Sequence, residues 1–141
     1  MKLTILVADD ETLECDAFEF MAKQSGIDCT CIKAKNGKEA TEKAMEFRPQ
    51  LIVLDIQMPV MSGLEAAEKI RTFLPDSMIV FLTAWGRFEF AQKAVRLNAT
   101  DYLVKPIEQE SVNALLDKCR KKLNISESEN NANRSEERRV G

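Results

Sequence analysis

Acidic and polar side chains follow four apolar segments of this 141-residue sequence, at the point where each segment ends. In chain order they are Asp9 and Asp10, then Asp55, Thr83 and Lys105. If the segments are neighbouring parallel strands, their carboxyl ends lie along one edge of a sheet, where open α/β sheets place their binding sites. Three carboxylates, a hydroxyl and an ammonium group would then share one pocket.

Such a pocket suits a divalent cation and phosphoryl chemistry. Carboxylates within a few ångströms repel by about 4 kcal/mol per close pair at an effective dielectric constant of about 20, and a hard cation relieves this repulsion. Mg²⁺ prefers oxygen ligands and retains waters, so Asp10 and Asp55 with one backbone carbonyl form a credible shell, which Asp9 joins directly or through water. A carboxylate beside Mg²⁺ can attack a phosphoryl group, and Asp55, which stands alone after the central segment, is the candidate nucleophile.

The remaining polar groups suit a phosphorylated carboxylate. Phosphorylation adds close to two negative charges, which the Lys105 ammonium and the Thr83 hydroxyl can partner. Each motif alone has a simpler interpretation, because Asp9-Asp10 can cap a helix, Thr83 can end a strand, and Lys105-Pro106 can form a turn. The occurrence of all of them at strand ends favours a shared site.

Strand-like and helix-like segments alternate five times along the chain. Apolar runs predict strands at residues 3–8, 29–34, 51–55, 78–82 and 102–104. Apolar residues at helical spacing predict one face of the first helix, at Leu13, Ala17, Phe20 and Met21, and one face of the last helix, at Val112, Leu115, Leu116, Cys119 and Leu123. A shorter pattern at Phe90, Ala94 and Leu97 predicts the fourth helix.

This alternation predicts a five-stranded, parallel, doubly wound α/β sheet with helices on both faces. Residues 51–55 are almost wholly apolar, which is typical of a central strand, whereas residues 29–34 are more polar and suit an edge. The strand order 2-1-3-4-5 satisfies both requirements. In that order the first and third strands are neighbours, so Asp9, Asp10 and Asp55 would meet at the switch point.

Composition is typical of one soluble domain, with 45% hydrophobic and 30% charged residues. The net charge of −3 gives no reason to expect nucleic-acid binding by the domain itself. No apolar run approaches the roughly 20 residues that span a bilayer, and no signal peptide is evident, so we expect a cytoplasmic protein without membrane contact. The four cysteines lack the spacing of a metal site and no histidine accompanies them, which favours structural thiols.

The chain divides at about residue 123. Residues 1–123 carry the alternating pattern, and residues 124–141 contain too few apolar side chains to bury. We expect a disordered tail or a truncated linker there, within a longer protein, and the abrupt end of residues 134–141 leaves open whether they are native.

Residues 1–123 closely resemble the receiver domain of two-component response regulators. The motifs that carry the resemblance are Val7-Ala8-Asp9-Asp10-Glu11, Leu54-Asp55-Ile56-Gln57-Met58-Pro59, Leu82-Thr83-Ala84, and Asp101 to Pro106. The resemblance implies a flavodoxin-like receiver fold, in which Asp55 accepts a phosphoryl group from the phosphohistidine of a sensor histidine kinase. It also implies Mg²⁺ bound by Asp9, Asp10, Asp55 and the Gln57 carbonyl, with Thr83 and Lys105 on the phosphoryl group.

The resemblance further implies a conformational switch. Thr83 and Tyr102 would shift together on phosphorylation, since movement of Thr83 toward phosphate vacates space for the ring of Tyr102. The peptide bond between Lys105 and Pro106 is usually cis in the family. Gln57, Ala84 and Trp85 would border the phosphate, although Trp85 can equally belong to an interaction face.

The face made by the fourth helix, fifth strand and fifth helix would then control an output, and it is also a candidate homodimer interface. Residues 85–95 look most like receivers attached to helix-turn-helix regulators of the arabinose-regulator type, which implies control of transcription in a longer protein. The domain would catalyse only its own phosphorylation and dephosphorylation.

Two alternatives remain. A phosphatase of the haloacid dehalogenase type would want a second aspartate where this chain has Gln57. A phosphate-independent interaction module would need none of the acidic, hydroxyl and lysine groups that this chain retains.

Overall fold

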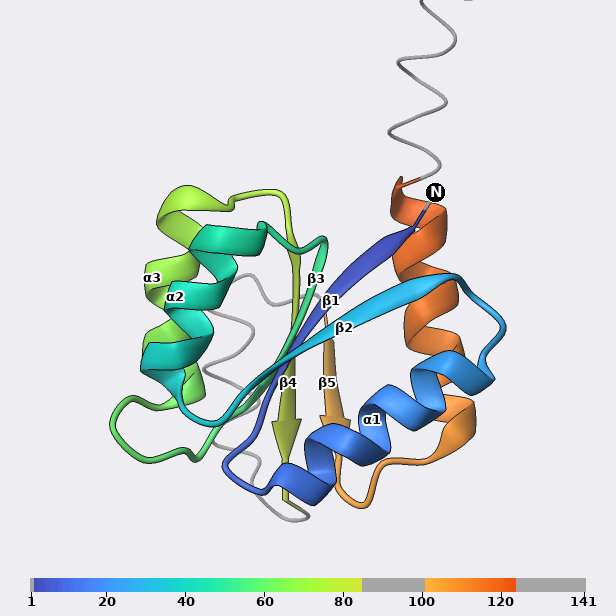
Figure 1. Ribbon diagram of the computed structural model, residues 1–141, viewed down its shortest axis with the longest axis horizontal. Coiled ribbons are helices and arrows are strands. Elements are labelled where there is room, and N and C mark those ends of the chain that lie inside the picture. The colour runs from blue at the N-terminus through green and yellow to red at the C-terminus, as the bar shows by residue number, and fades with distance from the viewer. Residues whose placement is uncertain (1, 85–100, 124–141) are drawn as a thin grey trace, which may run out of the picture.

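A single parallel sheet forms the centre of the protein, for which a computed structural model describes residues 2–84 and 101–123. In these residues the strand order is β2-β1-β3-β4-β5, which confirms the predicted topology (Figure 1). The strands are β1 (Leu3–Ala8), β2 (Cys29–Ala34), β3 (Leu51–Asp55), β4 (Met78–Thr83) and β5 (Asp101–Val104).

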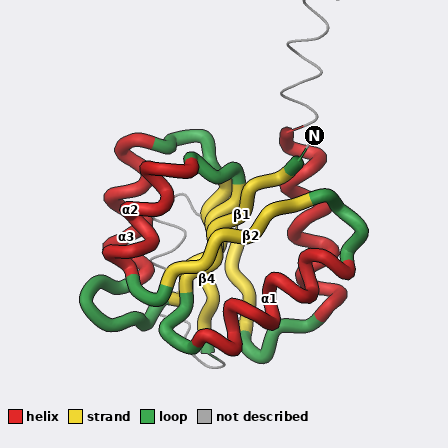
Figure 2. The backbone as a smooth tube through the Cα atoms, viewed as in Figure 1, coloured by secondary structure: helices red, strands yellow, loops and turns green. Residues whose placement is uncertain are grey.

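Helices cover both faces of this sheet (Figures 1 and 2). Helix α1 (Thr12–Gln24) and the helix at residues 109–123 pack on one face, and α2 (Gly37–Phe47) and α3 (Gly63–Phe73) pack on the other. The predicted fourth helix falls within residues 85–100, outside the described residues.

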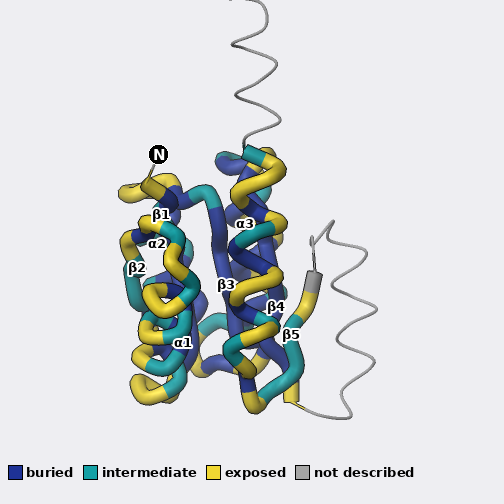
Figure 3. The backbone as a smooth tube through the Cα atoms, turned by 90° about the vertical axis from the view of Figure 1, so that its right-hand side faces the viewer, coloured by how far each residue is buried: buried dark blue, intermediate teal, exposed yellow. Residues whose placement is uncertain are grey.

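Strand β3 is apolar throughout because both of its faces are covered. Leu51 and Val53 belong to the core shared with α1 and residues 109–123, and Ile52 and Leu54 belong to the core shared with α2 and α3. Figure 3 shows this strand buried behind more exposed helices. A continuous apolar run is the pattern expected for a parallel strand between two helical layers, so the central placement of β3 is confirmed.

The apolar face predicted for α1 was wrong in part, because Met21 packs against the core but Leu13 and Phe20 do not. Leu13 is 81% exposed and Phe20 is 64% exposed, whereas Cys15, Phe18 and Ala22 are buried. Successive residues turn by about 100° around a helix, which places the two sets on opposite sides of α1. Because α1 carries apolar residues on both sides, spacing alone did not decide which side faces the sheet.

The last helix agrees with its predicted face. Val112, Leu115, Leu116 and Cys119 are buried, and Leu123 packs against the same core. No helix among the described residues is long and apolar enough to cross a membrane.

Polar caps define the starts of the two helices that follow β2 and β3. The Ser62 hydroxyl caps α3, since it accepts a hydrogen bond from the Glu65 N–H at 3.2 Å, and it also donates a hydrogen bond to the Glu65 carboxylate at 3.3 Å. The Asn36 side chain accepts a hydrogen bond from the Glu39 N–H at 2.8 Å. These caps fix where the chain leaves the carboxyl edge of the sheet.

All four cysteines are free thiols. Cys15, Cys29 and Cys119 are buried and Cys31 is half-buried. Burial raises the pKa of the Cys15 and Cys119 thiols to about 11, so both remain protonated at neutral pH. These two side chains therefore pack as small apolar groups.

Replacement of Phe81 tests the importance of the core on the α2 side. Phe81 is fully buried on β4, so Phe81→Ala should lower the free energy of unfolding by about 3–5 kcal/mol in urea titrations. The matched change Phe20→Ala, at a residue 64% exposed, should cost less than about 0.5 kcal/mol. Equal losses in the two variants would contradict the assigned core.

Candidate functional site

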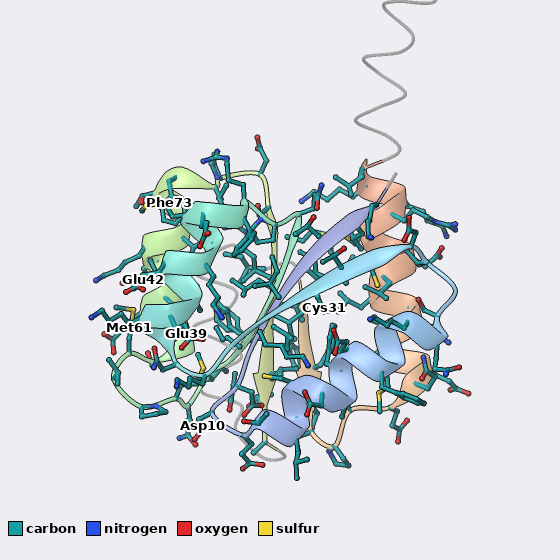
Figure 4. All side chains as sticks on the ribbon, in the orientation of Figure 1. Asp10, Cys31, Glu39, Glu42, Met61 and Phe73 are labelled. Atoms are coloured by element: carbon teal, nitrogen blue, oxygen red, sulfur yellow. The ribbon has the colours of Figure 1, made fainter. Side chains whose placement is uncertain are left out.

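The site lies at the carboxyl edge of the sheet, where β1 and β3 end side by side. Strand pairing places Ala8 opposite Leu54, so the next residues, Asp9 and Asp55, come level with each other. The strand order reverses between β1 and β3, which is the usual position of binding sites in open α/β sheets. Figure 4 labels Asp10 at this edge, toward which the arrowheads of β4 and β5 point in Figure 1.

Three carboxylates meet there. Asp9, Asp10 and Asp55 each offer one oxygen, and these oxygens all lie within 4.8 Å of one another. Asp9 and Asp55 are buried, with 1% and 8% of their surface exposed, whereas Asp10 is exposed. The predicted convergence is therefore present, and Asp10 opens the cluster to solvent.

Lys105 reaches the cluster from the loop after β5. Its Nζ atom lies 2.8 Å from Asp9 Oδ2 and donates a hydrogen bond to Asp55 Oδ2 at 3.2 Å. Burial disfavours the charged ammonium, but both carboxylates outweigh that effect and raise the pKa of Lys105 above its usual value. Lys105 therefore remains protonated and offsets part of the negative charge.

Asp9 is held by two contacts. Its Oδ1 accepts a hydrogen bond from the Glu11 N–H at 3.0 Å, and its Oδ2 forms an ion pair with the Lys105 ammonium at 2.8 Å. One lysine does not neutralise three carboxylates, so the cluster keeps excess negative charge. Because all three carboxylates are hard oxygen ligands, the cluster fits Mg²⁺.

The helix-capping interpretation of Asp9 and Asp10 does not hold. The residue at the N-cap position of α1 is Glu11, and its side chain makes no capping hydrogen bond. Asp9 bonds to the backbone of the turn before the helix, and Asp10 belongs to the acidic cluster.

The carboxylate of Asp55 is held from two sides. Oδ1 accepts a hydrogen bond from the Gln57 N–H at 3.3 Å, and Oδ2 faces Lys105. Burial and the adjacent charge of Asp9 raise the pKa of the Asp55 carboxyl to about 6, although Lys105 acts in the opposite direction. At neutral pH the group is largely ionised, at a cost to the stability of the fold.

A pocket of about 310 Å³ opens above the carboxylates. Liquid water occupies about 30 Å³ per molecule, so the pocket has room for a phosphoryl group together with a hydrated cation. Besides Asp10 and Asp55, its lining contains four residues that the sequence predicted for the site and three that it did not. The first set is Gln57, Thr83, Ala84 and Lys105, and the second is Glu11, Ile56 and Leu82.

The end of β4 brings Thr83 into the pocket wall. Thr83 is buried, and its hydroxyl donates a weak hydrogen bond to the Ala84 carbonyl at 3.3 Å. The Lys105 N–H donates to the Thr83 carbonyl at 2.9 Å, which ties the loop after β5 to the end of β4. The Thr83 hydroxyl is thus available to exchange a weak acceptor for a stronger one.

Two other predicted residues lie away from the pocket lining or outside the described chain. Tyr102 is 44% exposed on β5 and does not line the pocket. Trp85 falls within residues 85–100, outside the described residues. The peptide bond between Lys105 and Pro106 is cis.

Comparisons with known proteins agree with this geometry. The family model described as response regulator receiver domain matches residues 5–117. The sensory transduction protein LytT of Oceanobacillus iheyensis is 32% identical over 123 residues, which cover 87% of this chain and 50% of that protein. The chemotaxis protein CheY of Listeria monocytogenes is 32% identical over 119 residues, which cover 84% of this chain and 99% of that protein.

A solved structure shows the same fold. The REC domain of AraT, a response regulator from Geobacillus stearothermophilus, superposes with a TM-score of 0.82 at 29% identity and covers 90% of this chain and 99% of that one. The chain spans about half the length of the LytT relative that it matches.

The raised pKa of Asp55 predicts a stabilising substitution. Since the folded protein binds this proton more tightly than the unfolded chain, stability should fall as pH rises from about 4 to about 6. In metal-free buffer above that window, Asp55→Asn should raise the free energy of unfolding by about 2 kcal/mol, and the gain should vanish below about pH 4.

Asp28→Asn is a suitable control because Asp28 is exposed before β2, at the opposite edge of the sheet. It should change stability by less than about 0.5 kcal/mol at any of these pH values. A wild type more stable than Asp55→Asn at neutral pH would show that Lys105 outweighs burial and the Asp9 charge.

Proposed function

The chain belongs to the response regulator receiver domains of two-component systems, and from this premise we propose that Asp55 is the residue that accepts the phosphoryl group. The observation that carries the assignment is the meeting of three carboxylates with one lysine, in which Asp55 alone lies at the end of the central strand and contacts both Gln57 and Lys105. The donor is the phosphohistidine of a sensor histidine kinase.

In the proposed reaction a carboxylate oxygen of Asp55 attacks the phosphorus atom. A phosphorus–oxygen bond forms, the phosphorus–nitrogen bond breaks, and the electron pair leaves with the imidazole of the donor. The Gln57 N–H and the Lys105 ammonium hold the carboxylate in place before attack. Lys105 and the Thr83 hydroxyl are placed in the pocket wall where they can donate to phosphoryl oxygens.

We assign the cation site to Asp9, Asp10, Asp55 and the Gln57 carbonyl. When bound, Mg²⁺ would neutralise charge on the carboxylates and on the phosphoryl oxygens. The convergence of the three carboxylates supports this assignment, because one oxygen of each lies within 4.8 Å of the others.

Phosphorylation would change the face that contains β5. Thr83 would exchange the Ala84 carbonyl for a phosphoryl oxygen, and the exposed ring of Tyr102 would turn inward. Phosphate can favour this state only by binding it more tightly than the other. The face that contains β5 and the helix at residues 109–123 would then regulate an output or pair two copies of the domain.

We assign residues 1–123 to the receiver domain and residues 124–141 to a tail or linker. The family match to residues 5–117 supports the boundary. Transcription is the output we favour, because a matched relative from Bacillus subtilis is described as a transcriptional regulatory protein. The domain itself would act in the cytoplasm, bind neither nucleic acid nor membrane, and catalyse only its own phosphorylation and dephosphorylation.

Phosphorylation by a small-molecule donor tests the assignment of Asp55. After incubation with acetyl phosphate and Mg²⁺, intact mass spectrometry should detect one base-labile phosphoryl group on the wild type. Asp55→Asn should show none, because it lacks the nucleophilic carboxylate. Absence of the adduct from the wild type, together with binding of a partner that Asp55→Asn retains, would instead support a phosphate-independent module.

Asp10 tests the cation site separately from the nucleophile. Asp10→Asn should weaken Mg²⁺ binding at least about 10-fold in calorimetric titrations, since it removes one of the converging carboxylates. Glu11→Gln is matched in charge and lines the same pocket, but Glu11 does not belong to the three-carboxylate cluster. Equal losses of affinity in the two variants would indicate general electrostatic attraction and would argue against coordination by Asp10.

A further inference from the structure

The loop between β3 and α3, residues 56–62, is held by a helix that the proposed reaction does not use. The first residue of α2, Gly37, donates its N–H to the Met61 carbonyl at 3.0 Å. The first N–H groups of a helix have no partner within the helix, so the loop supplies the acceptor that Gly37 lacks. Figure 4 shows Met61 beside α2.

Thr41, one turn further along α2, adds a second contact to the same loop residue. Its hydroxyl donates to the Gly37 carbonyl at 2.8 Å and lies 3.7 Å from Met61 Sδ. Backbone and side chain of Met61 are thus both contacted from α2. We call Gly37, Thr41 and Met61 the loop clamp.

Close backbone contacts fix the loop at two places. A Cβ atom on Gly37 would lie 2.2 Å from the Met61 carbonyl oxygen, and one on Gly63 would lie 2.2 Å from the Asp55 carbonyl oxygen. Only glycine allows either approach without displacement. The loop is therefore pressed against α2 at Met61 and against the end of β3 at Gly63.

The backbone just before the contact at Met61 is strained. Val60 has a φ of 70°, which is unusual for a β-branched residue, and its side chain is 78% exposed, so burial of that side chain does not compensate. Backbone strain persists where surrounding contacts over-determine the conformation. The loop clamp supplies such contacts at the next residue, Met61.

The clamp is connected to the phosphorylation site by a short closed path. The Gly63 N–H donates to the Ile56 carbonyl at 2.9 Å, which closes the loop into a ring that contains Gln57. The Gln57 N–H in turn contacts Asp55 Oδ1. If Met61 moved, the backbone between Ile56 and Gly63 would have to change conformation. That backbone includes Gln57, which contacts Asp55.

We propose that Gly37 and Thr41 are positioning residues for the phosphorylation site: through Met61, the loop clamp sets where Gln57 presents its carbonyl to the cation and its N–H to Asp55. This inference rests on the proposed function, because it assumes the cation site that includes the Gln57 carbonyl. It adds α2 to the elements that determine affinity for Mg²⁺.

The first test is Gly37→Ala in the full chain. The added methyl group should displace the Met61 carbonyl and raise the dissociation constant for Mg²⁺ about 10-fold in calorimetric titrations. Phosphorylation by acetyl phosphate should slow at low Mg²⁺ and recover when Mg²⁺ is saturating, since Asp55 itself is intact. Urea unfolding should be measured on the same samples.

Gly26→Ala is the matched control. Gly26 has a φ of 83°, so alanine is strained there, but a Cβ atom would meet nothing within 4 Å. It precedes β2, at the edge of the sheet opposite the site. This variant should lose stability and yet bind Mg²⁺ within about 2-fold of wild type, a change too small to reflect a displaced ligand.

Thr41→Val provides a second variant if Gly37→Ala does not fold. It removes the hydroxyl while it preserves the shape of the side chain, and it should raise the dissociation constant for Mg²⁺ about 3-fold, less than Gly37→Ala because it does not displace the Met61 carbonyl directly. Thr72→Val is its control, because the Thr72 hydroxyl likewise donates to a carbonyl of its own helix, that of Lys69, and is exposed.

Failure of the inference is distinguishable from failure of the proposed function. If the wild type neither binds Mg²⁺ nor accepts a phosphoryl group, the site assignment itself is wrong. If the wild type does both, and the folded Gly37→Ala or Thr41→Val variant binds Mg²⁺ as its control does, the loop clamp has no positioning role. A rise confined to the clamp variants supports the inference.

Discussion

Excess negative charge at one edge of the sheet is the constraint on which the rest of the site depends. Parallel pairing of β1 with β3 brings Asp9 level with Asp55, and Asp10 completes a cluster that Lys105 only partly neutralises. The raised pKa of Asp55 reflects the free-energy cost of an ionised carboxylate that is buried beside Asp9 in the folded protein. Three carboxylates held together at this cost are typical of a functional site, and they agree with the cation site that we propose.

The surrounding fold must hold the three carboxylates together against their electrostatic repulsion. Strands β1 and β3 are buried on both faces, which prevents their ends from separating without loss of core packing. The loop after β3 adds a second restraint, because Gly63 lies against the backbone of Asp55 and Met61 lies against α2. The charged residues are therefore fixed by backbone contacts and by two hydrophobic cores together.

Sequence alone predicted the strands, their order and the convergence of Asp9, Asp10, Asp55 and Lys105, because burial on two faces leaves an apolar run with a polar end. It did not predict which side of α1 is buried, since both sides carry apolar residues and only packing distinguishes them. Contacts such as that between Gly37 and Met61 join residues distant in the chain through backbone atoms. Neither periodicity nor residue type indicates such contacts, so the contact between α2 and the loop after β3 could not be predicted from the sequence.

Lys105 contacts both the carboxylate cluster and the carboxyl end of β4, and it lies directly after β5. Its ammonium is shared between Asp9 and Asp55, while its backbone N–H is bonded to Thr83 at the end of β4. Under the proposed function, a phosphoryl group on Asp55 would compete for that ammonium and for the Thr83 hydroxyl at once. Both groups stand where β4 and β5 end, so redistribution of their hydrogen bonds would act directly on the strand that carries Tyr102. Under the same proposal, phosphorylation of Asp55 would act on the face of β5 through Lys105 and Thr83, without any intermediate element.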